Sequence, residues 1–181
     1  MSRSVRCAPR AALVWLVTVL SVALSQASYA EQFAAHALRG MQRVNVAVEG
    51  VNPDFARYGL SVGEMRQRIE AKLIAAGLEV ADDAAAQSDA AVGQLRVKLT
   101  AVESSYGYYS YAIAVQARRK IPLSADGGFV SQAVWNNGQS GISNPSDLRK
   151  IYLLVDELLA DFVSTHGSDN VAAGAAASRA R

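Results

Sequence analysis

Three consecutive segments of the chain alternate apolar and polar side chains, and this pattern constrains the fold more strongly than any other feature. The segments are Gln94–Val102, Tyr109–Leu123 and Phe129–Asn136, and short turns separate them. Alternation with a period of two is typical of strands that bury one face. Because short turns join neighbouring antiparallel strands, the sequence predicts three successive strands paired in this way.

A strand, a helix and a short strand are predicted before this unit. Gln42–Val51 alternates with valine on one side, as a half-buried strand does. Ser61, followed three residues later by Glu64, predicts a helix start in which Ser61 caps the first turn and Glu64 reaches back to it. Gly77 ends this helix, and Leu78–Val80 follows as a short strand.

A second helix is predicted near the C-terminus. It begins with Asn144 as its cap and Pro145 in the first helical position, and it carries a wide apolar face through Val163. The preceding stretch, Asn136–Ser143, is rich in glycine and asparagine and predicts a loop. Residues 167–181 contain little apolar bulk and are predicted to be a disordered tail.

Together these segments predict a single α+β domain over residues 42–166. It has one mixed, mainly antiparallel sheet of four to five strands, in the order β-α-β-β-β-β-α along the chain, packed by two main helices. Residues 31–41 form a lead-in segment before the domain. The length of this part of the chain suits one hydrophobic core.

The first thirty residues have the pattern of a signal peptide. Arg3, Arg6 and Arg10 form a basic region, Ala11–Leu24 is an apolar run, and small residues precede a cleavage site near Ala30. An uncleaved membrane anchor is the alternative, but the apolar run is short for about 30 Å of hydrocarbon. We therefore expect a periplasmic or secreted protein with no integral membrane segment in the mature chain.

Cysteine usage and charge exclude further classes of site. The only cysteine, Cys7, lies before the apolar run, so it would be removed with the signal peptide and could not carry a lipid anchor. Of 18 basic and 16 acidic residues, three arginines and no acidic residue lie within residues 1–30. The remaining 15 basic and 16 acidic residues nearly balance, so a nucleic-acid surface is not expected.

No pattern in the sequence predicts a catalytic, cofactor or metal site. His36 and His166 are predicted to be solvated, because neither has a second metal ligand at helical spacing. The segment Gly138–Ile142 approaches the nucleophile motif of serine hydrolases around Ser140, but its second glycine comes one place early. We expect a protein that is not an enzyme, and a serine hydrolase is the least favoured alternative.

Two pairs of acidic neighbours could carry acid–base chemistry only if they faced one another across a cleft. These pairs are Asp82-Asp83, in a predicted loop, and Asp156-Glu157, on the second helix. Solvated charge is the favoured interpretation, because carboxylates are rarely buried.

Four of the seven tyrosines lie within six residues, at the turn before the second long strand and in the first residues of that strand. Tyr109 and Tyr111 share the parity of the apolar residues in that strand and are predicted to face the core or its rim. Tyr106 and Tyr108 flank Gly107 at the turn and are candidates for a partner surface, because exposed tyrosine offers rigid contact area with a polar tip.

The order of elements resembles the small periplasmic α+β domains of uncharacterised exported bacterial envelope families. More remotely, it is similar to the fold shared by the curli-secretion lipoprotein, the penicillin-binding-protein activator lipoprotein and the TolB amino-terminal domain. The resemblance is one of pattern, and it rests on Val44–Val48, Ser61–Gly77, Tyr111–Val115, Val130–Trp135 and the helix end Leu158–Val163. It implies an α+β fold that acts by binding other proteins and brings no catalytic residues. Those relatives are mostly lipidated, and this chain lacks the cysteine that lipidation requires.

The sequence therefore predicts an envelope protein-interaction domain that binds an envelope protein or a second copy of itself. The alternative is a periplasmic protein that binds a small ligand or a polysaccharide. In that alternative, Trp135 joins Tyr106 and Tyr108 across the hairpin.

Overall fold

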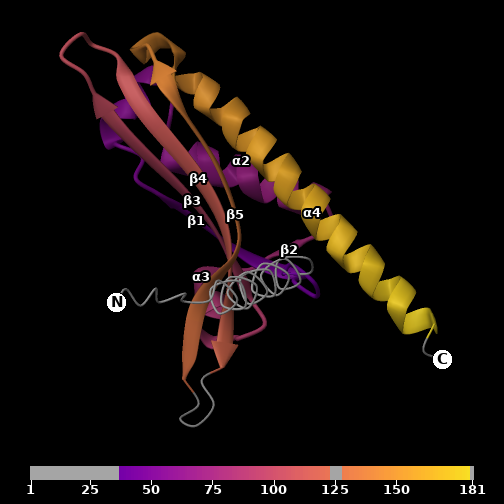
Figure 1. Ribbon diagram of the computed structural model, residues 1–181. Coiled ribbons are helices and arrows are strands. Elements are labelled where there is room, and N and C mark those ends of the chain that lie inside the picture. Colours follow the sequence, from indigo (N-terminus) through magenta and orange to yellow (C-terminus); the bar gives the residue numbers. More distant parts are fainter. Residues whose placement is uncertain (1–36, 123–127, 180–181) are drawn as a thin grey trace, which may run out of the picture. The chain divides into compact units, whose positions relative to one another are not determined.

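The computed structural model describes residues 37–122 and 128–179. A five-stranded mixed sheet in the order β2-β1-β3-β4-β5 forms its centre (Figure 1). β1 runs parallel to both β2 and β3, whereas β3, β4 and β5 are successive antiparallel neighbours. This arrangement confirms the predicted fold class. The strands are β1 (Arg43–Glu49), β2 (Glu79–Val80), β3 (Gly93–Glu103), β4 (Tyr109–Pro122) and β5 (Phe129–Ser143).

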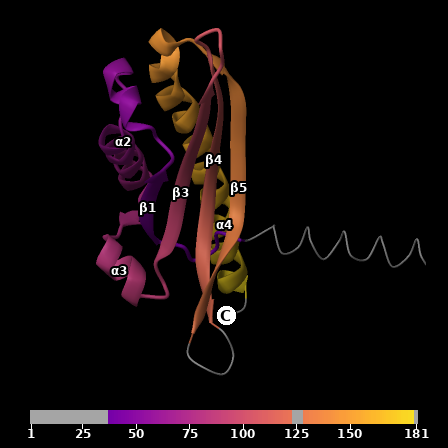
Figure 2. The same ribbon diagram turned by 90° about the vertical axis from the view of Figure 1, so that its left-hand side faces the viewer.

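Two main helices, α2 (Val62–Ala75) and α4 (Ile151–Arg179), lie on the same face of the sheet (Figures 1 and 2). The short α3 (Asp83–Ser88) lies beside β1, and the 3-10 helix η1 (Pro53–Tyr58) precedes α2. The predicted helix start at Asn144 is a second 3-10 helix, η2 (Pro145–Lys150), which leads directly into α4. Among the described residues, no helix is both long and apolar enough to cross a membrane.

The core lies between the sheet and α2 and α4. It contains the apolar sides of the strands and the apolar helix faces that the periodicity predicts. Its buried members include Val44, Val46, Leu95, Val97, Leu99, Ile113 and Val115 from the strands, and Met65, Ile69, Leu73, Leu148, Ile151, Val155, Leu158, Leu159 and Phe162 from the helices.

The start of α2 matches the predicted cap on one side only. Ser61 Oγ accepts a hydrogen bond of 3.2 Å from the backbone N–H of Glu64, as predicted. Glu64 does not reach back to Ser61 directly, because Tyr152 of α4 stands between them. The Ser61 N–H donates to the Tyr152 hydroxyl (3.0 Å), and that hydroxyl donates to Glu64 Oε2 (3.1 Å). The cap therefore also joins α2 to α4.

The predicted loop at Asn136–Ser143 is wrong, because β5 continues to Ser143. Its glycines mark close approaches between strands instead of turns. A Cβ atom at Gly138 would lie 2.6 Å from the carbonyl oxygen of Ile113, and one at Gly141 would lie 2.7 Å from the Tyr111 hydroxyl. At Gly138 the close atom belongs to the β4 backbone, so only glycine fits there, whereas at Gly141 the Tyr111 side chain would have to shift.

The boundaries of the folded unit also differ from the prediction. α4 extends to Arg179, so the residues expected to form a disordered tail are helical for most of their length. Polar contacts fasten this extension: Asp169 Oδ2 accepts from the Leu38 N–H (3.0 Å), and Asn170 Oδ1 accepts from the Gly40 N–H (2.8 Å). Leu38 itself is fully buried, so the fold begins within the predicted lead-in. The predicted signal peptide, residues 1–30, lies outside the described residues, as do residues 31–36.

Candidate functional site

The turn between β3 and β4 is a hydrogen-bonded hairpin at one end of the sheet (Figures 1 and 2). The Ser104 N–H donates to the Tyr108 carbonyl oxygen (2.7 Å), and the Tyr108 N–H donates to Ser104 Oγ (3.2 Å). Gly107 has a φ of +77°, a conformation that favours glycine, and its N–H closes the turn on the Ser104 carbonyl oxygen (3.0 Å). The backbone thus holds the turn without using either tyrosine ring.

The structure separates the four tyrosines as their parity predicts. Tyr106 and Tyr108 are 86% and 47% exposed, whereas Tyr109 is buried. The Tyr109 ring makes an edge contact with Phe55 at 5.3 Å between centroids, and its hydroxyl donates to Glu103 Oε2 (3.1 Å). Burial and then this carboxylate raise the pKa of Tyr109. Tyr111 is half-buried and packs against the core.

Two exposed aliphatic residues that the sequence reasoning missed lie beside the tyrosines. Val102 is 64% exposed and Ile142 is 75% exposed. Val102 pairs with Ser110, and Ser110 pairs with Ile142, so the two aliphatic side chains flank one small residue on the same face. Tyr108 precedes Ser110 by two residues and shares its parity. We call Val102, Tyr106, Tyr108 and Ile142 the tip patch.

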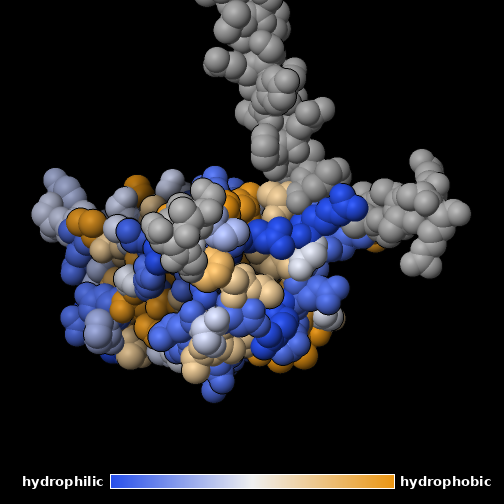
Figure 3. Space-filling model, turned by 90° about the horizontal axis from the view of Figure 1, so that it is seen from below, coloured by the Kyte–Doolittle hydropathy of each residue, from blue (hydrophilic) through white to orange (hydrophobic). Residues whose placement is uncertain are grey.

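The tip patch lies on the face of the sheet opposite α2 and α4, because its strand residues alternate with core residues. Neighbouring strands are about 4.8 Å apart, which puts Val102 and Ile142 roughly 10 Å from each other across β4. The opposite end of the molecule shows a mixed surface of hydrophilic and hydrophobic residues (Figure 3). A period-two pattern carried through Ser143 would not have placed Ile142 on this face, because the bulge at Val134 reverses the parity between the two halves of β5.

Trp135 is not part of this patch. It pairs with Ala117 on β4, eight positions from Tyr109, a separation of roughly 26 Å at 3.3 Å per residue. Its side chain is half-buried and makes an edge contact with Phe162 of α4, with 5.4 Å between the ring centroids. The strand register therefore contradicts the proposed meeting of Trp135 with the tyrosines.

The other candidate residues have structural partners. Ser140 lies within β5, where it pairs with Ala112, so it does not occupy the strand-to-helix turn of a nucleophile motif. His36 lies outside the described residues. His166 is half-buried, which differs from the expected solvated side chain, and its Nε2–H donates to the Met41 carbonyl oxygen (2.6 Å). Within the described part of the chain, no group of three or more His, Cys, Asp or Glu residues could hold a metal ion.

The acidic pairs also make structural contacts. Asp82 caps α3 by accepting from the Ala85 N–H (2.7 Å). Asp156 lies between α2 and α4, where Arg68 Nη2 contacts Oδ2 at 2.6 Å and Lys72 Nζ contacts Oδ1 at 3.1 Å. Burial opposes the ionisation of Asp156, but hydrogen bonds from Arg68 and Lys72 outweigh it and hold the pKa below its usual range.

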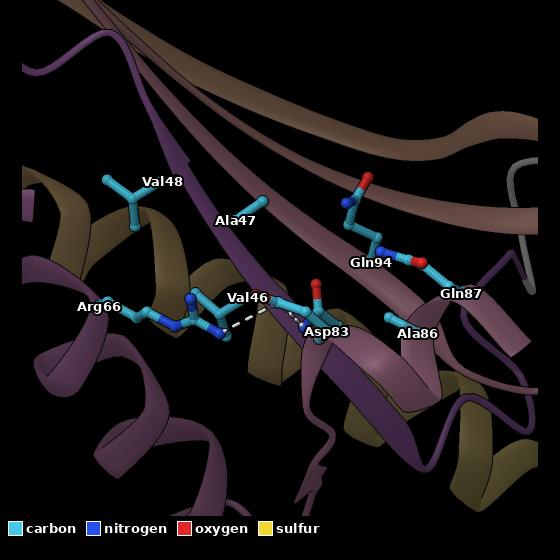
Figure 4. Close-up of a pocket in the computed structure, with 9 residues that line it drawn as sticks. Val46, Ala47, Val48, Arg66, Asp83, Ala86, Gln87 and Gln94 are labelled. Atoms are coloured by element: carbon cyan, nitrogen blue, oxygen red, sulfur yellow. Dashed lines mark hydrogen bonds and ion pairs between the residues drawn. The ribbon is translucent and has the colours of Figure 1, made fainter. Parts of the chain in front are cut away.

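A polar cleft lies between β1, β3 and the short α3 (Figure 4). Its charged side chains are paired with one another: Asp83 Oδ1 accepts from Asn45 Nδ2 (2.8 Å) and from Arg66 Nη2 (3.3 Å). The hydrogen bond from Asn45 and the charge of Arg66 lower the pKa of Asp83. The buried Asn45 also donates to the Ala81 carbonyl oxygen (3.1 Å). These contacts fix the start of α3 against β1, so Asn45, Arg66 and Asp83 already have a structural role.

Comparisons with known proteins place the chain in no family. No protein-family model matches it, and a search of curated proteins finds no match. Among solved structures, the chain is similar to a minor lipoprotein from Acinetobacter baumannii, with 11% identity and a TM-score of 0.33 over 68% of this chain and 90% of that chain. A likeness at this level does not assign the chain to a family. The predicted resemblance to small periplasmic α+β domains stays a prediction.

Proposed function

We propose that the chain is an exported, non-enzymatic interaction domain that binds a protein partner through the tip patch. The observation that carries this proposal is the clustering of two exposed tyrosines with two exposed aliphatic residues at one end of the sheet. Contiguous exposed apolar groups of this kind mark interaction surfaces, and tyrosine is enriched at such surfaces. The signal-peptide pattern of residues 1–30 supports export.

A protein partner suits the geometry better than a small ligand does. The tyrosines lie on a projecting turn and not in a cleft. The cavity that includes Ile142 is lined on its other side by η2 and α4 and has a volume of about 140 Å³. Ligand sites usually enclose about 300–1,000 Å³. The polar cleft beside α3, at about 420 Å³, is within this range, but none of its lining residues belongs to the tip patch, and Arg66 and Asp83 within it are paired with each other. The long separation of Trp135 from the turn also removes the aromatic pair that a polysaccharide site would have used.

The proposal can be tested by crosslinking in intact cells. A photo-crosslinking amino acid at Tyr106 should give a discrete adduct with another protein, and Tyr108→Ser should reduce the yield of that adduct. The same amino acid at Ile74, which is 62% exposed on α2, supplies the matched control. Equal adducts from Tyr106 and Ile74 would contradict the proposal.

A second measurement separates binding from folding. Because both tyrosines are exposed at a turn held by backbone contacts, replacing both with serine should change the free energy of unfolding by no more than about 0.5 kcal/mol. Urea denaturation of the double variant measures this change. A large loss of stability would show that the tyrosines are structural.

A further inference from the structure

We propose that two copies of this chain associate through β5, whose free edge pairs antiparallel with β5 of a second copy across a two-fold axis at Asn136. The two five-stranded sheets would then become one continuous sheet of ten strands. This surface shares Ile142 with the tip patch but contains none of Val102, Tyr106 and Tyr108, and the inference does not depend on the proposed function.

β5 is the last strand of the sheet, with β4 on one side and no strand on the other among the described residues. It is 15 residues long, whereas strands of about 5–6 residues are commonest. Along such an edge, the N–H and C=O groups of alternate residues point away from the sheet and can pair with another strand. One such group in β5, the Ser131 carbonyl oxygen, already accepts from Arg118 Nη2 of β4 (2.8 Å). Figure 2 shows β5 along the side of the sheet, with α4 behind it.

The devices that usually protect an edge strand are nearly absent from β5. Phe129–Ser143 contains no Lys, Arg, Asp, Glu or Pro, the residues that commonly block pairing at an edge. The sheet contains one bulge along β5, which falls at Val134, where the register shifts between Ala117 and Arg118 of β4. Trp135–Ser143 is then in unbroken register.

A second copy fits this edge because the strand is complementary to itself. In the register centred on Asn136, Phe129 of one copy faces Ile142 of the other, and Ser131 faces Ser140. The bulged Val134 is skipped on each strand, as it is against β4. Phe129 and Ile142 are 50% and 75% exposed, and both lie on the face opposite α4, as the pairing with β4 shows. The pairing would thus cover two exposed apolar side chains at each end.

The absence of charged residues from β5 also favours a second copy of this chain as the partner. A neutral strand that meets its own copy brings no like charges of the two strands together. Arg118 of β4 reaches Ser131, but in this register the two copies of Ser131 are roughly 26 Å apart, so the two guanidinium groups do not face one another. The small residues Gly138 and Ala133 also face one another in this register.

Two residues of β5 point toward α4: Trp135 contacts Phe162, and Asn137 Nδ2 donates to Asp161 Oδ2 (3.0 Å). Asn137 Oδ1 also accepts from the Gly138 N–H (2.8 Å), so a partner strand that uses this N–H would replace that contact.

Analytical ultracentrifugation of the protein purified from cells that express the full-length chain should show a monomer–dimer equilibrium. Asn136→Lys would place two like charges opposite one another at the axis and should raise the dissociation constant by roughly tenfold or more. Mixing Asn136→Lys with Asn136→Glu should restore dimers of mixed composition. Thr100→Lys is the matched control, because Thr100 is exposed on the same face of the sheet but in the interior strand β3.

Disulfide trapping tests the register. In a Cys7→Ser background, Asn136→Cys should form an oxidised dimer, because directly opposite strand residues lie within disulfide reach. Ser140→Cys should not, because the two copies of residue 140 would be roughly 26 Å apart in this register. A monomer at all concentrations, or equal trapping at both positions, would overturn the proposal. Neither cysteine substitution alters Tyr106 or Tyr108. Absence of a dimer would therefore contradict this inference without contradicting the proposed function, which crosslinking at Tyr106 tests separately.

Discussion

The two edges of the sheet differ in length and in charge. β2 forms one edge with two residues, Glu79 and Val80. Arg43 of the neighbouring β1 binds Glu79 Oε1 at 3.0 Å and Asp89 Oδ2 at 2.7 Å. β5 forms the other edge with 15 uncharged residues. A short edge flanked by ion pairs offers little backbone for pairing, whereas a long neutral edge offers much.

This difference indicates which edge of the sheet can pair with a strand of another chain. The β2 edge is closed by its shortness and by the ion pairs beside it, so a sheet extended there would gain few hydrogen bonds. The β5 edge has the length for a stable ladder, and α4 supports it from one face through the contact of Trp135 with Phe162. Variants that weaken either edge should therefore have different consequences for stability and for association.

The largest effect is expected from Gly138→Ala in β5. The added Cβ would lie 2.6 Å from the carbonyl oxygen of Ile113, a backbone atom that cannot move aside without shifting β4. Overpacking of this kind costs about 1–3 kcal/mol, and we expect the free energy of unfolding to fall by about 2–3 kcal/mol. Urea denaturation measures the loss.

The control for this prediction is Ser140→Ala, two residues along the same exposed face of β5. It should change the free energy of unfolding by no more than about 0.5 kcal/mol. If Gly138→Ala were equally mild, β5 would be free to move away from β4, and the edge would be less rigid than the register implies.

Gly138 also shows why the sequence predicted one half of β5 and missed the other. Alternation of bulky apolar residues identified the strands wherever one face lies on the core, as at Val97 and Val115. The second half of β5 carries glycine, asparagine and serine, which favour turns in isolation. Gly138 is required here because β4 approaches it closely. This is a tertiary constraint, which local sequence patterns do not reveal.

The C-terminal extension of α4 was missed for a related reason. Its described contacts are polar: Asp169 and Asn170 accept from backbone groups of the turn before β1. Hydrophobic periodicity carries no information about such contacts between segments distant in the sequence. The candidate site was predicted in the same partial way, since Tyr106 and Tyr108 were found from the sequence and Val102 and Ile142 became visible through the strand register.

An intermediate effect is expected from Asp156→Asn, which removes the carboxylate that joins α2 to the helix behind β5. Asp156 is 13% exposed and binds Arg68 and Lys72, both of which are more exposed. We expect a loss of about 1–2 kcal/mol at pH 7, because charge-assisted hydrogen bonds contribute about that much and solvent screens part of it. Glu157→Gln, at the exposed neighbouring position, is the control.

The pH dependence of this loss has a definite sign. The pKa of Asp156 is lowered in the folded protein, so its ionised form stabilises the fold above the unfolded pKa of about 3.9. That contribution is lost as the pH falls through the lowered folded pKa. The difference between the natural chain and Asp156→Asn should therefore be largest at neutral pH and shrink in acid. A difference that grows in acid would show that another group is responsible.

The smallest effect is expected at the β2 edge, from Arg43→Gln. Its ion pairs with Glu79 and Asp89 are partly exposed, so their loss should cost about 0.5 kcal/mol and less in 1 M salt. Arg39→Gln, at an exposed arginine outside the sheet, is the control. Denaturation at low and high salt measures the cost, and sedimentation measures association. If β2 is protected by its shortness, the variant should self-associate no more than the natural chain. A new, larger oligomer would show instead that the charges beside β2 keep this edge closed.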